Sequence, residues 1–355
     1  MHLTVLVPTA NRPSFLPSTL KSIANQTAKR HIKRVIVSEN GGYHGSKEIA
    51  YSFKNELPIE WIYQQESLTP QQHGIWLANQ VATPFVAQIA DDDMWDKYHL
   101  EESLLQLSHN QDSIAYFGQT VLVTDDSCWP RGVFTPPFGS VAAQNQNCPQ
   151  THLNNVEVWK PRDTALNSLS STPLNIWSVV AKTPAHCKAI AESAGHPTLG
   201  KCPSNDSLYI WRLSVQGDIL IGRHVSLFYR THPESDIQSC MTERPSQTNE
   251  EDLMIRKEIY YQALSLGIDA LDDWRMAYKK LPGVIRQQIP TFSRLNLDWL
   301  IESEPIDSKS SHWYAQKIYK HLKLATKLIL PPFILIGLLK CIKLFSMLKY
   351  NMFPA

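Results

Sequence analysis

Short apolar runs alternate with amphipathic segments through the first hundred residues of the chain. A β-branched run at residues 3–7 ends at Pro8, and apolar residues at helical spacing follow over 15–23, with Pro13 expected in the first turn of that helix. The chain therefore opens as strand, loop and helix. The alternation continues through two strands, a helix and a fourth strand at residues 34–38, 59–63, 72–81 and 85–90.

Four strand–helix repeats in a row predict an α/β fold with a doubly wound, mainly parallel sheet, because parallel neighbours need crossover helices. Ligands of such sheets collect at the carboxyl ends of the strands. Here those ends have the sequences Thr-Ala-Asn-Arg, Glu-Asn-Gly-Gly and Asp-Asp-Asp at residues 9–12, 39–42 and 91–93. We expect these polar segments to meet at one edge of the sheet.

The periodicity changes along the rest of the chain. Residues 128–171 are rich in Pro, Asn and Gln and predict long loops beside the site, which suit acceptor binding. Strand-like and helical segments resume at residues 176–181, 184–194, 207–215, 219–221 and 225–230. The chain is mainly helical after residue 249. We expect an α/β domain over 1–250, a helical extension over 251–321 and a basic, apolar tail over 322–355.

Composition narrows the class of protein. The 355 residues have a formal net charge of +1, so no global field attracts nucleic acid, which we do not expect as a partner. The six cysteines include no CxxC pair and no zinc-ligand spacing, which favours reduced thiols in a cytosolic protein. The apolar start is too short for a signal peptide or anchor, which predicts a cytoplasmic location.

The tail favours contact with a membrane surface. Residues 328–339 contain no charge but span only about 18 Å as a helix, against a hydrocarbon core of about 30 Å. Lysines surround this run, as in segments that lie in an anionic membrane interface. We therefore expect peripheral attachment to the inner membrane face. The alternative is a helix packed on the catalytic domain.

Three successive carboxylates are the most unusual chemistry in the sequence. Asp91, Asp92 and Asp93 directly follow a buried-looking strand and would repel one another unless a cation shares them. Oxygen ligands of this kind suit Mg²⁺ or Mn²⁺, which leave positions open for substrate phosphates. The alternative is an acidic helix start, in which Asp96 and its neighbours cap a helix over 98–107.

Four motifs resemble glycosyltransferase family 2, in the family's order over residues 3–235. They are residues 5–13 (VLVPTANRP), 34–42 (RVIVSENGG), 89–95 (IADDDMW), and 205–213 (NDSLYIWRL) with Gly217 and 227–232 (LFYRTH). The resemblance implies a GT-A type fold and an inverting, metal-dependent glycosyltransferase of the hexosyltransferase class, with a DXD-like acidic motif.

The resemblance also implies a nucleotide site. Pro8, Thr9, Asn11 and Arg12 after the first strand, and Glu39 after the second, would hold the nucleotide of a nucleotide-diphosphate sugar, with a UDP-sugar favoured. A carboxylate can accept the imide N–H of uracil or donors on guanine, and Arg12 can contact phosphate or the Glu39 carboxylate. Glu-Asn replaces the family's usual Asp-Asp or Asp-Asn here, which leaves the base open.

Metal ligands follow from the same resemblance. The family's longer acidic pattern begins with an aspartate where this chain has Ala90. We assign Asp92 as the best metal ligand, Asp93 as its support and Asp91 to the ribose side. His232 matches a position that supplies another metal ligand in some members. The alternative for His232 is a surface histidine.

Asp206 matches the family's proposed general base. Inversion requires one base to remove the proton of the acceptor hydroxyl while the nucleotide diphosphate leaves from the opposite face. A carboxylate before a helical run can instead be only its cap.

These motifs predict transfer of a sugar to a hydroxyl of a glycan or lipid-linked acceptor, in cell-surface polysaccharide biosynthesis. One rival is a sugar nucleotidyltransferase, which usually needs glycines in the first βα loop, where this chain has none. The other is a catalytically inactive carbohydrate-binding protein of the same fold.

Overall fold

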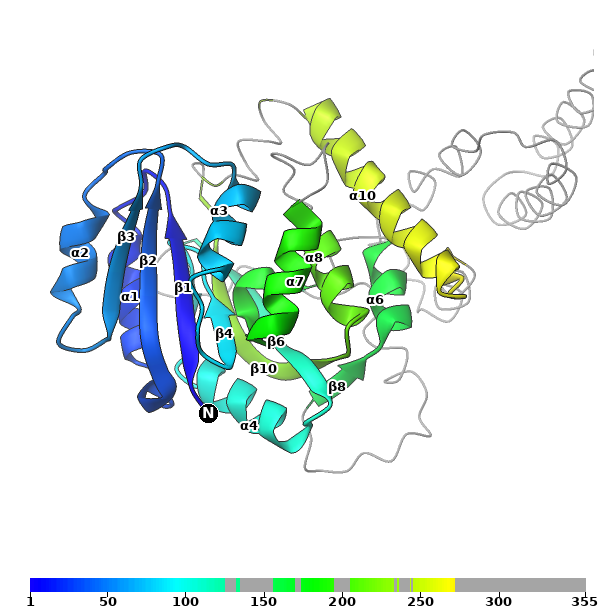
Figure 1. Cartoon of the computed structure of the whole chain (residues 1–355), viewed down its shortest axis with the longest axis horizontal. Helices are drawn as coiled ribbons and strands as arrows, with labels where there is room; N and C mark the ends of the chain where they lie inside the picture. Colours follow the sequence, from blue (N-terminus) through cyan, green and yellow to red (C-terminus); the bar gives the residue numbers. More distant parts are fainter. Residues whose placement is uncertain are drawn as a thin grey trace, which may run out of the picture. The chain divides into compact units, whose positions relative to one another are not determined.

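The fold is described from a computed structural model (Figure 1). It describes residues 1–124, 132–134, 156–169, 174–194, 205–232, 235, 243 and 245–271. All of these residues belong to one compact unit, Met1–Pro290. The expected tail over 322–355 and most of the expected extension over 251–321 lie outside the described residues.

One half of the sheet is parallel, as expected. Its strands lie in the order β3-β2-β1-β4, and each neighbouring pair runs in the same direction. The bounds are β1 Leu3–Thr9, β2 Ile32–Asn40, β3 Ile59–Gln64 and β4 Phe85–Gln88. The side chains of β1 are almost all buried because the strand is covered on both faces.

The other half of the sheet is mixed. β9 (Val179–Lys182) runs antiparallel between β4 and β6 (Ser113–Val123), and β10 (Asp218–Arg230) then runs parallel to β6. Three short strands pair antiparallel at the margins, namely β5 Met94–Trp95, β7 Gly132–Phe134 and β8 Val156–Trp159. Because β6 and β10 point the same way as β1, their carboxyl ends reach the same edge.

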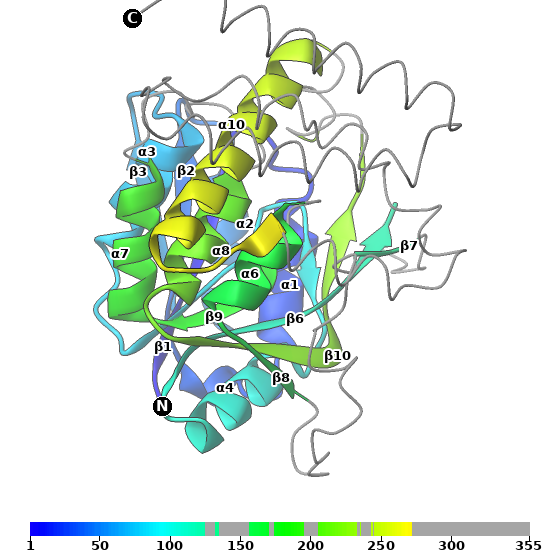
Figure 2. The same cartoon turned by 90° about the vertical axis from the view of Figure 1, so that its right-hand side faces the viewer.

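Helices cover both faces of the sheet (Figure 2). Apolar residues of α1 (Leu16–Ala24), α2 (Ser46–Ser52) and α4 (His99–His109) join one core with β1 and β2. On the other face α3 (Pro70–Ala78), α7 (Thr183–Ala194) and α8 (Asn205–Ser214) join a second core with β6 and β9. The helices α6 (Pro161–Ser168) and α10 (Pro245–Ser265) pack beside α8. No helix in the described ranges is long and apolar enough to cross a membrane.

The predicted start of the first helix was wrong. Pro13 lies in a turn before the helix, and α1 begins at Leu16 with Pro17 in its first turn. Asn11 adopts the left-handed backbone conformation with φ of 55°, which turns the chain after β1 and delays the helix. Asparagine tolerates this conformation better than most residues.

The composition predicted long loops over residues 128–171, and this prediction is wrong for part of the segment. The described parts contain β7, β8 and α6. Pro161 starts α6, and the Asp163 carboxylate accepts the backbone N–H of Lys160 at 3.0 Å. These elements are short, so their periodicity is hidden among the prolines and asparagines around them.

The two strand-like segments at 219–221 and 225–230 form one strand, β10. Its register against β6 shifts between Ile221 and Val225, and residues 223–225 are exposed there. A bulge therefore interrupts the apolar pattern without ending the strand.

The backbone of Gly222, beside this bulge, lies close to the Tyr116 side chain, and this contact can be tested by mutation. A Cβ at Gly222 would lie 1.8 Å from the buried Tyr116 hydroxyl oxygen, so we expect Gly222→Ala to destabilise the fold by about 1–3 kcal/mol. In Gly74→Ala the new Cβ would meet only an Ile190 methyl at 3.4 Å, and stability should change by less than about 1 kcal/mol. Thermal and chemical denaturation would compare the two; equal stabilities would contradict this packing.

Candidate active site

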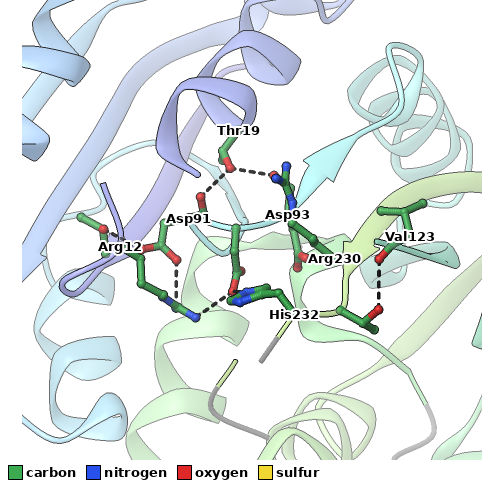
Figure 3. Close-up of polar contacts among 10 residues, drawn as sticks. Arg12, Thr19, Asp91, Asp93, Val123, Arg230 and His232 are labelled. Atoms are coloured by element: carbon green, nitrogen blue, oxygen red, sulfur yellow. Dashed lines mark hydrogen bonds and ion pairs between the residues drawn. The ribbon is translucent and has the colours of Figure 1, made fainter. Parts of the chain in front are cut away.

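Three segments meet at the carboxyl edge of the sheet (Figure 3). The loop after β1 contributes Arg12, the turn after β4 contributes the three aspartates, and the end of β10 contributes Arg230 and His232. Strand order explains the meeting, because β1 adjoins β4 and the short β5 after the aspartates pairs with β10. The predicted convergence is thereby confirmed for the loop after β1 and the acidic turn, and the end of β10 joins them.

Asp91 faces the first strand. Its carboxylate accepts a hydrogen bond from the Thr9 hydroxyl at 2.6 Å and forms an ion pair with the Arg12 guanidinium at 2.9 Å. The aspartate side chain is completely buried, whereas that of Arg12 remains 18% exposed. Arg12 therefore lies on the solvent side of this pair.

Asp92 lies between two nitrogen donors. Its Oδ2 atom is 2.7 Å from Nη1 of Arg12 and 3.0 Å from Nε2 of His232. The His232 ring packs on Phe15 with centroids 4.4 Å apart, and its side chain is only 8% exposed. His232 is therefore not a surface histidine.

Asp93 ties the acidic turn to the rest of the fold. Its Oδ1 atom accepts the backbone N–H of Arg230 at 2.9 Å. The Thr19 hydroxyl on α1 lies 2.8 Å from the Asp91 carbonyl oxygen and 2.7 Å from that of Asp93. The turn is thus fixed by one helix and one strand that are distant in the sequence.

The acidic turn is not a helix start. The helix α4 begins at His99, and the Asp96 carboxylate accepts the backbone N–H of Tyr98 at 2.9 Å. This bond turns the chain just before the helix, and no side chain caps the first turn of α4. The three preceding aspartates face inward and need another explanation.

Burial makes the carboxylate charges costly. Desolvation raises the pKa of Asp91 to about 7 although Arg12 opposes the rise, and Asp92 adds repulsion. Desolvation and the Asp92 charge also raise the pKa of Asp93 well above its usual range. One guanidinium does not fully offset this cluster, so the site favours an additional cation.

The donors fit a hard cation chemically. Asp93 Oδ2 and His232 Nδ1 are buried and accept or donate no hydrogen bond among the described residues. Carboxylate oxygens are suitable ligands for Mg²⁺ or Mn²⁺, whereas an imidazole nitrogen is a softer ligand than Mg²⁺ prefers. In the described part of the chain, however, no three His, Cys, Asp or Glu side chains are arranged around a common metal position. Arg12 occupies the place beside Asp91 and Asp92 instead.

Glu39 lies in the same row of the sheet as Thr9, because the two residues are register partners on β2 and β1. Its carboxylate accepts the backbone N–H of His44 at 2.7 Å and the hydroxyl of Ser46 at 2.6 Å. The Trp61 indole N–H donates to the same Ser46 hydroxyl oxygen at 2.8 Å. Glu39 therefore organises the loop that follows β2.

Asp206 lies in the first turn of α8. This helix ends at residue 214, just before β10 starts at the amino edge of the sheet beside Ser113. A helix that packs on the sheet and precedes a strand by a tight turn runs antiparallel to it, which directs Asp206 toward the carboxyl edge. Desolvation raises the Asp206 pKa to about 7.

Sequence reasoning missed three residues of this site. Thr19 had no signal because a threonine in an amphipathic helix is common. Phe15 was read only as part of an apolar pattern, yet its ring contacts His232 and lies 5.0 Å from the Arg230 guanidinium. Arg230 belongs to one of the family-like motifs, but it contacts Asp93 through its backbone N–H. Every residue except proline has such a group, so the residue type gave no signal.

The Thr19 contacts predict a measurable loss of stability. Thr19→Val keeps the shape of the side chain but leaves two buried carbonyl groups without their hydroxyl, so we expect a loss of about 1–3 kcal/mol. Thr27→Val, eight residues further along the chain, removes only exposed hydrogen bonds to the Lys97 carbonyl and the Glu101 carboxylate, so its loss should be smaller, at about 0.5 kcal/mol. Urea denaturation would measure the free energy of unfolding of both variants. If Thr19→Val were as stable as the wild-type protein, the Thr19 hydroxyl would not stabilise the acidic turn.

Comparison with known proteins supports the motif assignment. Residues 4–157 match the model of the family described as Glycosyl transferase family 2. Validoxylamine A glucosyltransferase of Streptomyces hygroscopicus subsp. jinggangensis (strain 5008) is 31% identical over 64 residues, which are 18% of this chain and 15% of that protein. The counterpart from subsp. limoneus is also 31% identical over 64 residues and is covered to 14%. The matched stretch is thus a small part of these relatives.

A solved structure supports the fold. S. aureus TarS 1-349 in complex with UDP-GlcNAc superposes with a TM-score of 0.53 at 14% sequence identity, over 91% of this chain and 81% of that one. At this identity the likeness speaks for the fold alone. Residues 4–157 of the chain are therefore similar to glycosyl transferase family 2, and the chain has the GT-A type α/β fold that its motifs predicted.

Proposed function

We propose that the chain is an inverting, metal-dependent glycosyltransferase that moves a sugar from a nucleotide-diphosphate donor to a hydroxyl group of an acceptor. The observation that supports this most strongly is the buried acidic turn at the carboxyl edge of the sheet, within a segment that matches the model of glycosyl transferase family 2. Positive charge beside a departing diphosphate stabilises the negative charge that grows on it, and the carboxylates of this turn could bind a cation that supplies this positive charge.

We propose a UDP-sugar as the favoured donor. TarS, which shares the fold, has been crystallised with UDP-GlcNAc, and the validoxylamine relatives are named glucosyltransferases. Thr9 and Arg12 contact the acidic turn from the β1 side, and together with Pro8 and Asn11 they would face the nucleotide. The Glu39 carboxylate would act on the base mainly through the loop that it organises.

We propose that Asp92, Asp93 and His232 hold Mn²⁺ or Mg²⁺, with Asp91 toward the ribose. When bound, the ion would neutralise charge that grows on the departing diphosphate. The protein's own contribution is to desolvate and orient the carboxylates through Thr9, Thr19 and the Arg230 backbone.

Asp206 is the proposed general base. It would accept the proton of the acceptor hydroxyl as that oxygen attacks the anomeric carbon. A carboxylate with a pKa of about 7 is a stronger base than an ordinary aspartate and is still largely ionised slightly above neutral pH. Asp206 is partly exposed, which would let an acceptor hydroxyl reach its carboxylate.

A glycan or lipid-linked acceptor in cell-surface polysaccharide synthesis remains our proposal, with the tail over 322–355 attaching the enzyme to the inner membrane face. An activity assay separates this proposal from the two alternatives, a sugar nucleotidyltransferase and an inactive carbohydrate-binding protein. Hydrolysis or transfer from a UDP-sugar with Mn²⁺ supports transfer, formation of a sugar nucleotide from a sugar phosphate supports a nucleotidyltransferase, and binding without turnover supports an inactive binding protein.

The base assignment predicts a specific pH profile. Only ionised Asp206 can accept a proton, so the rate should rise about tenfold per pH unit well below pH 7 and level off above it. Asp206→Asn should reduce kcat by at least about 100-fold and leave donor binding unchanged. Asp218→Asn changes a surface aspartate paired with Lys160 and serves as the control. Retained turnover in Asp206→Asn would discard this role.

The metal assignment predicts a selective loss. Asp92→Asn should reduce Mn²⁺-stimulated transfer by about 100-fold or more, because the carboxylate shared by Arg12 and His232 loses its charge. Asp96→Asn, only a few residues away, keeps an oxygen that can accept from Tyr98 and should retain near-normal activity. Titration of activity with MnCl₂ is the measurement, and equal effects of the two variants would argue against a metal at Asp92.

A further inference from the structure

We propose that Arg12 occupies the cation position of the acidic turn until a nucleotide diphosphate draws its guanidinium away, which makes metal and donor bind cooperatively. This inference rests on the proposed function. It assigns to Arg12 a role beyond contact with phosphate, namely that of coupling the two ligands.

One guanidinium spans two carboxylates. Nη2 of Arg12 is 2.9 Å from Asp91 Oδ1, and Nη1 is 2.7 Å from Asp92 Oδ2 (Figure 3). The planar fork of arginine matches this two-point contact. Arg12 therefore supplies the positive charge that the two aspartates would otherwise need from a metal ion.

Among the side chains of this cluster, Arg12 is the one most able to move away from the aspartates. Asp91 is completely buried and Asp92 is 9% exposed, whereas the Arg12 side chain is 18% exposed and belongs to the loop between β1 and α1. His232, the other donor to Asp92, is 8% exposed and packs against Phe15. A change of arginine rotamer would thus open the cluster without moving its core.

A divalent ion at Asp92 competes with this contact. Oδ2 of Asp92 already accepts from two nitrogen atoms, and an ion placed there would repel the neighbouring guanidinium. Without a nucleotide, Arg12 would have to exchange two carboxylates for water. The metal alone should therefore bind weakly.

A diphosphate changes this balance, because its oxygens offer the guanidinium a new two-point partner near the place that it leaves. The arginine then neutralises phosphate charge while the metal takes over the carboxylates. By linkage, a nucleotide that favours the displaced arginine tightens metal binding, and the metal tightens nucleotide binding by the same factor.

The test is direct binding of MnCl₂ to the full chain by calorimetry, with and without UDP. We expect Arg12→Gln to bind Mn²⁺ in the absence of nucleotide about fivefold or more tightly than the wild-type protein, and UDP to improve its Mn²⁺ affinity by a smaller factor. A purely structural Arg12 would give the opposite sign, since its loss would disorder the turn and weaken the metal site.

Two variants serve as comparisons. Arg34→Gln removes another guanidinium–carboxylate pair, between Arg34 near the start of β2 and Glu60 on β3, and should leave Mn²⁺ affinity unchanged. Arg12→Lys keeps the charge without the two-point geometry and should fall between wild type and Arg12→Gln.

The outcomes separate this inference from the proposed function. If wild type binds Mn²⁺ and UDP and turns over donor, but Arg12→Gln binds Mn²⁺ no more tightly, only the coupling role is overturned. If Arg12→Gln does not fold, equal Mn²⁺ affinity of the wild type with and without UDP overturns it. Turnover without any Mn²⁺ binding overturns both the coupling role and the metal assignment, while sugar transfer itself stands.

Discussion

Burial of three adjacent carboxylates in the turn after β4 is the constraint on which the rest of the site depends. Aspartate side chains are rarely buried without partners, because each loses the hydration of its charge. The fold supplies those partners from the Thr9 hydroxyl, the Arg12 guanidinium and the Arg230 backbone N–H. Thr9 and Arg12 lie near the start of the domain sequence and Arg230 lies near its end, so the acidic turn connects these two parts of the chain.

This connection joins the parallel half of the sheet to the mixed half. β1 and β4 bring the loop of Arg12 beside the aspartates, while the pairing of β5 with β10 brings Arg230 and His232 from far along the chain. Thr19 holds the backbone of the same turn from α1. The site is therefore assembled only when both halves of the sheet are formed.

The same constraint relates stability to chemistry. A cluster with raised carboxyl pKa values disfavours its own ionised form, and any bound cation relieves that cost. Arg12 supplies part of the relief from within the chain, and a metal with a diphosphate would supply more. Residual electrostatic strain of this kind is common where a protein must bind charged ligands.

The sequence by itself determined the four strand–helix repeats, the polar strand ends and the order of the family motifs, because these depend on local periodicity and residue type. It could not reveal that Asp96 turns the chain before α4 without capping the helix, that Glu39 organises its own loop, or that one arginine spans Asp91 and Asp92. Those facts depend on strand order and on which buried atoms find partners. Only tertiary structure decides the Arg12 pairs, since contacts between residues some eighty positions apart leave no periodic trace in the chain. The local contacts of Glu39 and Asp96 depend on the conformation that the fold gives to their loops.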